Sequence, residues 1–401
     1  MKITKKILIK DLISLIILGF FIGGVVGSID ALFGRVLLFL SDVRVDYFNY
    51  LIFFLAPAGM LFTYFFLKYG KSATKGMGLI FQVGFEEEEA IPKRLVPFIM
   101  IGTWMTHLFG GSAGREGVAV QLGATVANWF GRFANIPNRT SVFLVTGMAA
   151  GFAGLFETPI AAIFFALEVL VIGNLKYEAL LTSMIAAFTA SYVSHSLGLE
   201  KFAVDLAVDT TLDPLVALKL VGLGIIFGLV GLSFTFLLKK AKQLLVDKIE
   251  NPILRIGLVG LAVSILLFLF WHGRYSGLGT NLISASFAND PIYNYDWLLK
   301  LVLTVITLAA GFQGGEVTPL FAIGASLGLV LGSLFSLPVT LVAALGYAAV
   351  FGSATNTLLA PIFIGAEVFG FEYLPFFFIT CSVAYLCNLN QSIYGAQRKM
   401  L

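Results

Sequence analysis

Glu116 is the residue of this sequence whose type and neighbours point most clearly to chemistry. It lies in the run Gly110-Gly111-Ser112-Ala113-Gly114-Arg115-Glu116-Gly117, which is followed by apolar residues from Val118 to Trp129. A glycine-rich stretch that opens a helix presents free backbone N–H groups and the positive end of the helix dipole, so it favours an anion. A carboxylate in apolar surroundings is costly unless such donors solvate it. The pattern predicts that Glu116 both carries protons and competes with an anion for one site.

Two other interpretations of this motif have to be weighed against that one. The Glu116–Arg115 pair could be exposed on a loop at a membrane surface. The letters Gly110-x-Ser112-x-Gly114 also match a nucleophile elbow, and His107 is near in sequence. An elbow needs a preceding strand within an α/β sheet, and the sequence offers neither a strand nor an acid placed to orient a histidine. We therefore expect that the protein is not an enzyme.

Two further glycine-rich motifs open apolar runs. The second has a proline in the first turn of its predicted helix, and the convergence of two helix N-termini favours an anion over a cation. The third is weak by itself, because a flexible turn beside the acidic run Glu86–Glu89 would explain it. The motifs are Gly311-Phe312-Gln313-Gly314-Gly315-Glu316-Val317-Thr318-Pro319 and Gly76-Met77-Gly78-Leu79-Ile80-Phe81.

The composition shows where these motifs must lie. Of 401 residues, 58% are hydrophobic and only 12% are charged, and the net charge is +3. Water could not solvate so much apolar surface on a folded chain of this length. The composition excludes a soluble enzyme, a disordered chain and a nucleic-acid-binding protein. The two cysteines, Cys381 and Cys387, are expected to be free thiols, and neither a metal site nor a cofactor is predicted.

The elements that position the motifs are about thirteen apolar segments, predicted as membrane helices. Several are too short for the roughly 20 residues that span a bilayer, which predicts broken helices meeting near its midplane. The segments are 11–40, 47–68, 95–109, 118–130, 141–154, 159–173, 179–198, 214–238, 253–271, 298–311, 318–335, 338–352 and 358–388, the last taken as two helices.

An internal repeat divides the chain into two halves. Residues 147–169 match 346–368 at a shift of 199, and this match pairs Glu168 with Glu367. The glycine-rich stretch 110–124 matches 311–325 at a shift of 201. We predict a first transmembrane repeat at 11–196 and a second at 214–388.

The charge pattern predicts that the two halves are inverted. Four lysines precede the first helix of the first half, whereas the corresponding helix at 214–238 follows an acidic loop and ends at lysines. Lysine and arginine mark the cytoplasmic side. We therefore expect corresponding helices to cross the membrane in opposite directions. The segment 1–10 and the C-terminal segment 389–401 would both be cytoplasmic, with no soluble regulatory domain.

These motifs together resemble the CLC family of chloride channels and proton-coupled antiporters over about residues 10–396. Gly114-Arg115-Glu116-Gly117 resembles the gating-glutamate motif of that family. Gly315-Glu316-Val317-Thr318-Pro319 and Gly76-Met77-Gly78 lie where the family has Gly-x-Phe-x-Pro and Gly-Ser-Gly-Ile-Pro. Tyr394 falls where the family places its central tyrosine. The resemblance implies an all-α polytopic membrane protein, an inverted repeat of many tilted and broken helices.

Departures from the family pattern resemble its bacterial fluoride/proton antiporter branch. Met77 replaces the central serine, Ile80 a proline, and Val317 the phenylalanine of the second motif. Val118 follows the gating motif in place of proline. In chloride-handling antiporters an inner proton-relay glutamate follows the aligned Glu168, and here that position is Val169.

The resemblance implies a transporter that exports fluoride in exchange for protons across the cell membrane of a bacterium, with Glu116 as gate and proton carrier. A chloride/proton antiporter and a passive anion channel of the same fold remain alternatives. The positive ring edges of Phe81 and Phe85 are candidate anion contacts. The implied anion-binding residues are Met77, Gly78, Arg115, Gly117, Glu316, Val317, Thr318 and Tyr394.

The family further implies a homodimer in the lipid bilayer, in which each subunit has its own ion pathway. A two-fold dimer buries the same patch on both subunits. We expect a patch of bulky apolar residues from the segments 160–195 and 358–388, represented by Phe376, Phe377, Phe378 and Ile379.

Overall fold

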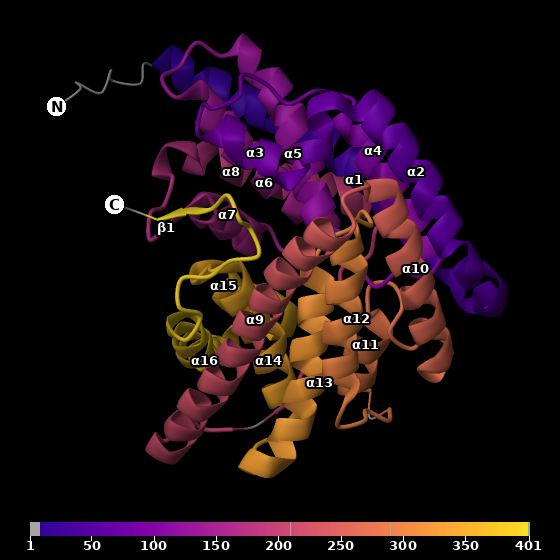
Figure 1. Cartoon of the computed structure of the whole chain (residues 1–401). Helices are drawn as coiled ribbons and strands as arrows, with labels where there is room; N and C mark the ends of the chain where they lie inside the picture. The colour runs from indigo at the N-terminus through magenta and orange to yellow at the C-terminus, as the bar shows by residue number, and fades with distance from the viewer. Residues whose placement is uncertain (1–8, 209, 289, 400–401) are drawn as a thin grey trace.

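Helices account for nearly all the regular structure of the chain (Figure 1). The computed structural model describes residues 9–208, 210–288 and 290–399. The helices of the first half are α1 (Ile9–Leu51), α2 (Leu55–Gly70), α3 (Met77–Gly84), α4 (Leu95–Leu108), α5 (Glu116–Phe130), α6 (Arg139–Phe156), α7 (Pro159–Glu168) and α8 (Leu180–Ser196). Those of the second half are α9 (Pro214–Lys248), α10 (Pro252–Leu269), α11 (Thr280–Phe287), α12 (Asp296–Ala310), α13 (Val317–Phe335), α14 (Val339–Thr355), α15 (Leu359–Phe369) and α16 (Leu374–Leu386).

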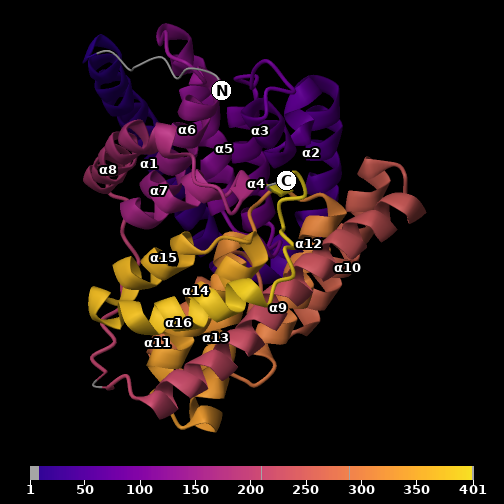
Figure 2. The ribbon, with the colours of Figure 1, turned by 90° about the vertical axis from the view of Figure 1, so that its left-hand side faces the viewer.

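Short elements join these helices. Short 3₁₀ segments are Ile52–Phe54, Lys71–Lys75, Gly131–Phe133, Tyr177–Ala179, Trp271–Gly273 and Phe371–Tyr373. Two short strands, β1 (Val171–Ile172) and β2 (Arg398–Lys399), pair in parallel. The C-terminal segment leaves α16 and runs back to the first half to make this pairing (Figures 1 and 2).

Each helix pairing in the first half has its counterpart eight helices later. The pairs α1–α8, α5–α6 and α1–α6 correspond to α9–α16, α13–α14 and α9–α14. Close approach of backbones explains the glycines of the repeat, because a side chain on Gly123 would overlap the Gly147 carbonyl, and one on Gly324 that of Gly346. Small residues at helix crossings are a common means of packing in lipid, where no water is expelled.

Equivalent residues of the two halves also touch one another. Phe164 and Phe363 stack with ring centroids 4.6 Å apart and an interplanar angle of 8°. Glu168 accepts hydrogen bonds from the N-terminus of α15, and Glu367 accepts them from the N-terminus of α7. Reciprocal contacts of this kind are what a two-fold axis between the halves produces. The boundaries at 11–196 and 214–388 stay a prediction.

Several predicted element boundaries were wrong, because charged residues were taken as loops. The helix predicted to end at 40 continues through Asp42 and Arg44 and ends at Leu51 after a kink at Tyr47. The helix predicted to end at 238 continues past three lysines and ends at a fourth, Lys248. The short helices α3 and α11 were not predicted, since neither is long enough for a helical period to show. The prediction of two helices within 358–388 was correct, as α15 and α16 are separate. Lys2, Lys5 and Lys6, used for the topology, lie outside the described residues.

The outer surface is apolar, as lipid requires. Five segments of the described chain are long and apolar enough to cross a membrane. Leu218 on α9 and Leu269 at the end of α10 are among the large apolar side chains that point outward. The predicted dimer patch is partly wrong, because Phe376 and Phe377 are buried inside the chain and only Phe378, with 57% exposed, points fully outward.

Candidate functional site

The glycine-rich loops before α5 and α13 are bonded directly to each other. The Gly114 N–H donates to the Gly315 carbonyl over 2.5 Å, and the Gly315 N–H donates to the Gly114 carbonyl over 2.7 Å. This two-residue bridge fixes the N-termini of α5 and α13 side by side, although they are 201 residues apart in sequence. The convergence predicted from the sequence is therefore present in the structure.

Glu116 is fully buried, and its carboxylate lies on donors from both halves. Its Oε2 accepts from the backbone N–H of Thr318 (3.1 Å) and of Arg115 (3.2 Å). Its Oε1 accepts from the Thr318 hydroxyl over 2.5 Å. The interpretation of Glu116 as an exposed residue of a surface loop is wrong, because this carboxylate occupies a nest of donors that suits any small anion.

Arg115 is the one cation in direct reach of this carboxylate among the described residues. Its Nε lies 3.9 Å from Glu116 Oε1, which is an ion pair at the limit of contact. Its Nε and Nη1 are buried and make no hydrogen bond to any described residue. The guanidinium therefore has donors left over.

Met77, Gly117 and Glu316 form a second group beside Glu116. A carbon atom added to Gly117 would lie 3.8 Å from Glu316 Oε2 and 4.0 Å from Met77 Cε. Nothing lies within 4 Å of the corresponding point on Gly78, so the backbone at the start of α3 borders open space. Val317 is buried at the first position of α13. The structure thus brings the three glycine-rich motifs to one place.

Tyr394 closes this place from the C-terminal segment. Its ring packs on Phe81 at 5.7 Å and on Phe165 at 6.2 Å between centroids, and its hydroxyl is buried without a partner. It is close enough to interact electrostatically with both Glu116 and Glu316. Phe85 lies one ring further out, 6.4 Å from Phe81, and its face is covered by the Arg398 guanidinium at 3.9 Å. Phe81 is therefore better placed than Phe85 to contact an anion.

Gln121 also belongs to this site, although it was not predicted from the sequence. Its Nε2 donates to the Gly117 carbonyl over 3.1 Å, while its Oε1 is buried without a partner and points toward Gly76. A polar residue one helical turn after Gly117 was the available signal.

At the inner relay position, Val169 is fully buried, and its carbonyl accepts from Gln397.

Lys300 was also missed, although it supports the first motif. This fully buried lysine donates to Ser112 Oγ (3.0 Å) and to the carbonyls of Tyr275 (3.1 Å) and Gly277 (2.7 Å). His107, predicted to be a packing residue, is buried with its ring nitrogens on the carbonyls of Thr103 and Ala113. Both residues hold the loop in front of Arg115 in place, and no residue here forms a nucleophile elbow.

Comparison with known proteins agrees with this geometry. Residues 54–389 match the family model described as voltage gated chloride channel. The chain belongs to this family, the CLC family of channels and transporters. A "Chloride/fluoride channel protein" of Pseudomonas syringae pv. tomato is 38% identical to it over 338 residues, which are 82% of this chain and 74% of the relative.

Solved CLC structures share the whole fold. A crystal structure of a CLC-type fluoride/proton antiporter is 60% identical and superposes with a TM-score of 0.95, covering 97% of this chain and 98% of the other. A slow cyanobacterial Cl⁻/H⁺ antiporter, at 20% identity and a TM-score of 0.78, covers 96% of both chains. The predicted family and the predicted all-α, inverted-repeat CLC fold are confirmed.

Thr318 offers a direct test of what holds Glu116. Thr318→Val keeps the shape but removes the hydroxyl donor, and a hydrogen bond to a charged group contributes about 1.5–3 kcal/mol. We expect Glu116 to leave this position in a large fraction of molecules, as seen by cryo-EM of the variant at neutral pH. Thr318→Ser restores the donor and serves as control. A Glu116 density unchanged in Thr318→Val would contradict this role.

Proposed function

We propose that this protein is a secondary active transporter that exports fluoride in exchange for protons across the cell membrane of a bacterium. One observation carries the proposal: a buried, protonatable carboxylate, Glu116, occupies donors that suit a small anion. The similarity to a fluoride/proton antiporter at 60% identity supports fluoride as the anion. The Pseudomonas relative supports a bacterial source.

Exchange follows from competition for these donors. While Glu116 is ionised, the Thr318 N–H, the Thr318 hydroxyl and the Arg115 N–H are satisfied by its oxygens. Protonation removes the negative charge, so the same donors become available to fluoride. A site that takes either the ionised carboxylate or the anion couples each fluoride movement to a proton movement. An inward proton gradient then drives fluoride out.

The wall of the site suits a small, strongly accepting anion. Met77 and Val317 offer no hydroxyl where the anion passes, whereas the unpartnered hydroxyl of Tyr394 can donate. Fluoride is a stronger hydrogen-bond acceptor than chloride and needs less space. We propose Met77, Gly78, Arg115, Gly117, Glu316, Val317, Thr318 and Tyr394 as the residues that surround the anion, with Phe81 contributing a ring edge and Phe85 a more distant one.

A passive channel or a chloride/proton antiporter of the same fold are the competing functions. The printed name of the Pseudomonas relative, a chloride/fluoride channel protein, favours including a channel in the test. Purified protein in liposomes should release fluoride with simultaneous proton uptake, measured with fluoride, chloride and pH electrodes. Fluoride release without proton uptake would indicate a channel. Chloride release equal to fluoride release, with proton uptake, would indicate a chloride/proton antiporter.

The first functional prediction concerns Glu116. Glu116→Gln cannot exchange a proton, so fluoride-driven proton uptake should fall to the level of protein-free liposomes. Fluoride flux should fall too if the carboxylate has to move to admit the anion. Glu89→Gln, an exposed change of the same type, is the matched control. Proton pumping that persists in Glu116→Gln would refute the assignment.

Met77 is the residue at which the selectivity for fluoride over chloride can be tested. Met77→Ser places a hydroxyl donor where chloride-handling relatives are expected to have one. Chloride, the larger anion, then loses fewer hydrogen bonds when it leaves water and enters the site. We expect the ratio of fluoride to chloride flux to fall at least several-fold in the electrode assay. Met60→Ser, on α2 and away from the motifs, should leave the ratio unchanged. If Met77→Ser keeps the wild-type ratio of fluoride to chloride flux, the selectivity depends on Val317 or Thr318 instead.

We also propose that the protein is a homodimer with both termini in the cytoplasm. α8 packs on α7, α16 packs on α15, and α7 and α15 contact each other. Both α8 and α16 carry exposed bulky side chains, among them Phe188, Tyr192 and Phe378. Ile379→Trp should split the dimer, with Leu258→Trp on α10 as control, measured by native mass spectrometry. The monomers should still transport fluoride, because each pathway lies within one chain. A folded but inactive monomer would contradict this architecture.

A further inference from the structure

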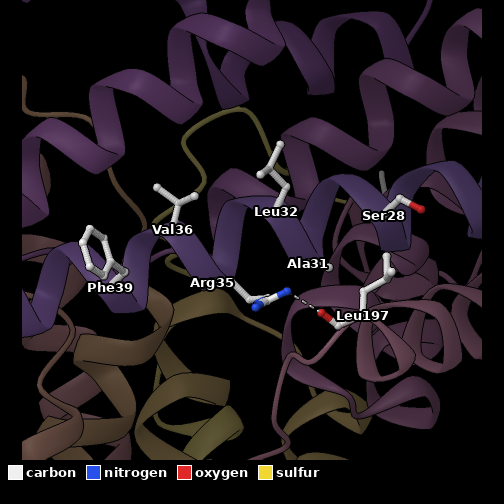
Figure 3. Close-up of a pocket in the computed structure, with 7 residues that line it drawn as sticks. All are labelled: Ser28, Ala31, Leu32, Arg35, Val36, Phe39 and Leu197. Carbon is white, nitrogen blue, oxygen red and sulfur yellow. Dashed lines mark hydrogen bonds between the residues drawn. The ribbon is translucent and has the colours of Figure 1, made fainter.

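Arg35 is an arginine on the outer surface of α1 that the exchange mechanism does not use. Its side chain is exposed, and its Nη1 donates over 2.9 Å to the carbonyl of Leu197, directly after the end of α8 (Figure 3). A guanidinium has five N–H donors and is always charged. Among the described residues, no carboxylate forms an ion pair with Arg35. The side chain therefore has donors and a positive charge to offer to a further ligand.

A groove with mostly apolar walls and a volume of about 430 Å³ lies beside this guanidinium. Six residues of α1 between Ser28 and Phe39 line it, together with Leu197 (Figure 3). The six are spaced so that they share one face of the helix. Leu32 is 56% exposed and Phe39 is 65% exposed, so the described chain leaves this face largely open. In a membrane such a face contacts lipid.

Two observations place Arg35 near a boundary of the hydrocarbon layer. It follows Asp11, in the first turn of α1, by 24 residues. That is about 36 Å of helix, and a tilted helix of this length still spans most of a hydrocarbon core of about 30 Å. Independently, α8 ends at Ser196, and a segment with Glu200 and Lys201 follows it. The guanidinium therefore lies at the level of the lipid phosphates.

We propose that this groove binds one glycerophospholipid, with its phosphodiester on Arg35 and an acyl chain along Leu32, Val36 and Phe39. Phosphate oxygens accept from two N–H groups of a guanidinium at once and supply the negative charge that the described chain does not. An arginine among outward apolar side chains is costly unless it reaches such a headgroup. The apolar walls and the single cation at the boundary match the two parts of this ligand.

A lipid bound here would strengthen the contact between α1 and α8. In the middle of the two helices the backbones pack by shape, because a carbon atom added to Gly27 would lie 2.5 Å from the Ala190 carbonyl oxygen. At the end of α8, the contact depends on the bond from Arg35 to Leu197. A headgroup on Arg35 fixes the guanidinium in the position from which it makes that bond.

The first test measures binding of palmitoyl-oleoyl-phosphatidylglycerol to the detergent-purified protein by native mass spectrometry. Arg35→Gln keeps an N–H donor but removes the charge, so the dissociation constant of the first bound lipid should rise about fivefold or more. Lys219→Gln removes a cation that donates to the helix-end carbonyl of Ser336 on another face, and it should bind as the wild type does. Equal affinity in Arg35→Gln and wild type would overturn the proposal, as would equal binding of a diacylglycerol with the same chains.

The second test locates the lipid by photo-crosslinking from a diazirine in the acyl chain. We expect label on the peptide that contains residues 28–39. Leu32→Trp fills the groove and should remove this label, whereas Leu258→Trp, an exposed change on α10, should keep it. Unchanged labelling in Leu32→Trp would overturn the proposal. Loss of a dimer in Leu32→Trp with unchanged lipid binding would show that a second copy covers the groove, which would also overturn it. Neither test depends on which anion the protein transports.

Discussion

The structure depends on one constraint, which is that a negative charge in an apolar interior needs hydrogen-bond donors. The chain meets it with backbone N–H groups at helix N-termini, since a membrane interior offers no water. At Glu116 the first half supplies the N-terminus of α5, with the Arg115 N–H as its donor. The mutual hydrogen bonds of Gly114 and Gly315 bring the second terminus to the same place, so the carboxylate of Glu116 in the first half can rest on Thr318 of the second. The inverted repeat is therefore part of the binding chemistry as well as of the architecture.

Two other buried carboxylates, away from the anion site, also accept hydrogen bonds from helix N-termini of the opposite half. Glu168 accepts from the N-terminus of α15, and its repeat equivalent Glu367 accepts from the N-terminus of α7. Each half thus provides the carboxylate that satisfies a broken helix of the other. The sequence repeat that paired these glutamates reflected this reciprocal contact, which explains why two charged residues are tolerated inside apolar segments.

Local patterns allowed much of the site to be predicted, and the rest depends on contacts across the chain. Glycine-rich runs before apolar stretches identified the three motifs, and Glu116 was identified as the carboxylate among them. Gln121 and Lys300 were not identified. Gln121 was marked only by its place one helical turn after Gly117, and Lys300, a single charged residue in an apolar helix, has no signature until its partners are known. The ends of α1 and α9 were misjudged for a related reason, since a helix can continue through charged residues, as α1 does through Asp42 and Arg44 before its kink at Tyr47.

Buried polar groups of this chain differ in how many of their hydrogen-bond donors and acceptors have a partner. Groups with every donor bonded belong to the fixed scaffold, and groups with unbonded donors can change partners. Lys300 has three N–H donors and three oxygen acceptors, and these join Ser112 of the first half to Tyr275 and Gly277 of the second. A buried charge with every donor used has no better arrangement to move to, so it stabilises one geometry. Arg115 differs from Lys300, because its Nε and Nη1 are buried without a hydrogen-bond partner among the described residues, so no such bond fixes these two donors. Lys300 therefore belongs to the fixed scaffold, whereas Arg115, whose Nε lies 3.9 Å from Glu116, is the charged group beside the proton carrier that this scaffold leaves able to change partners.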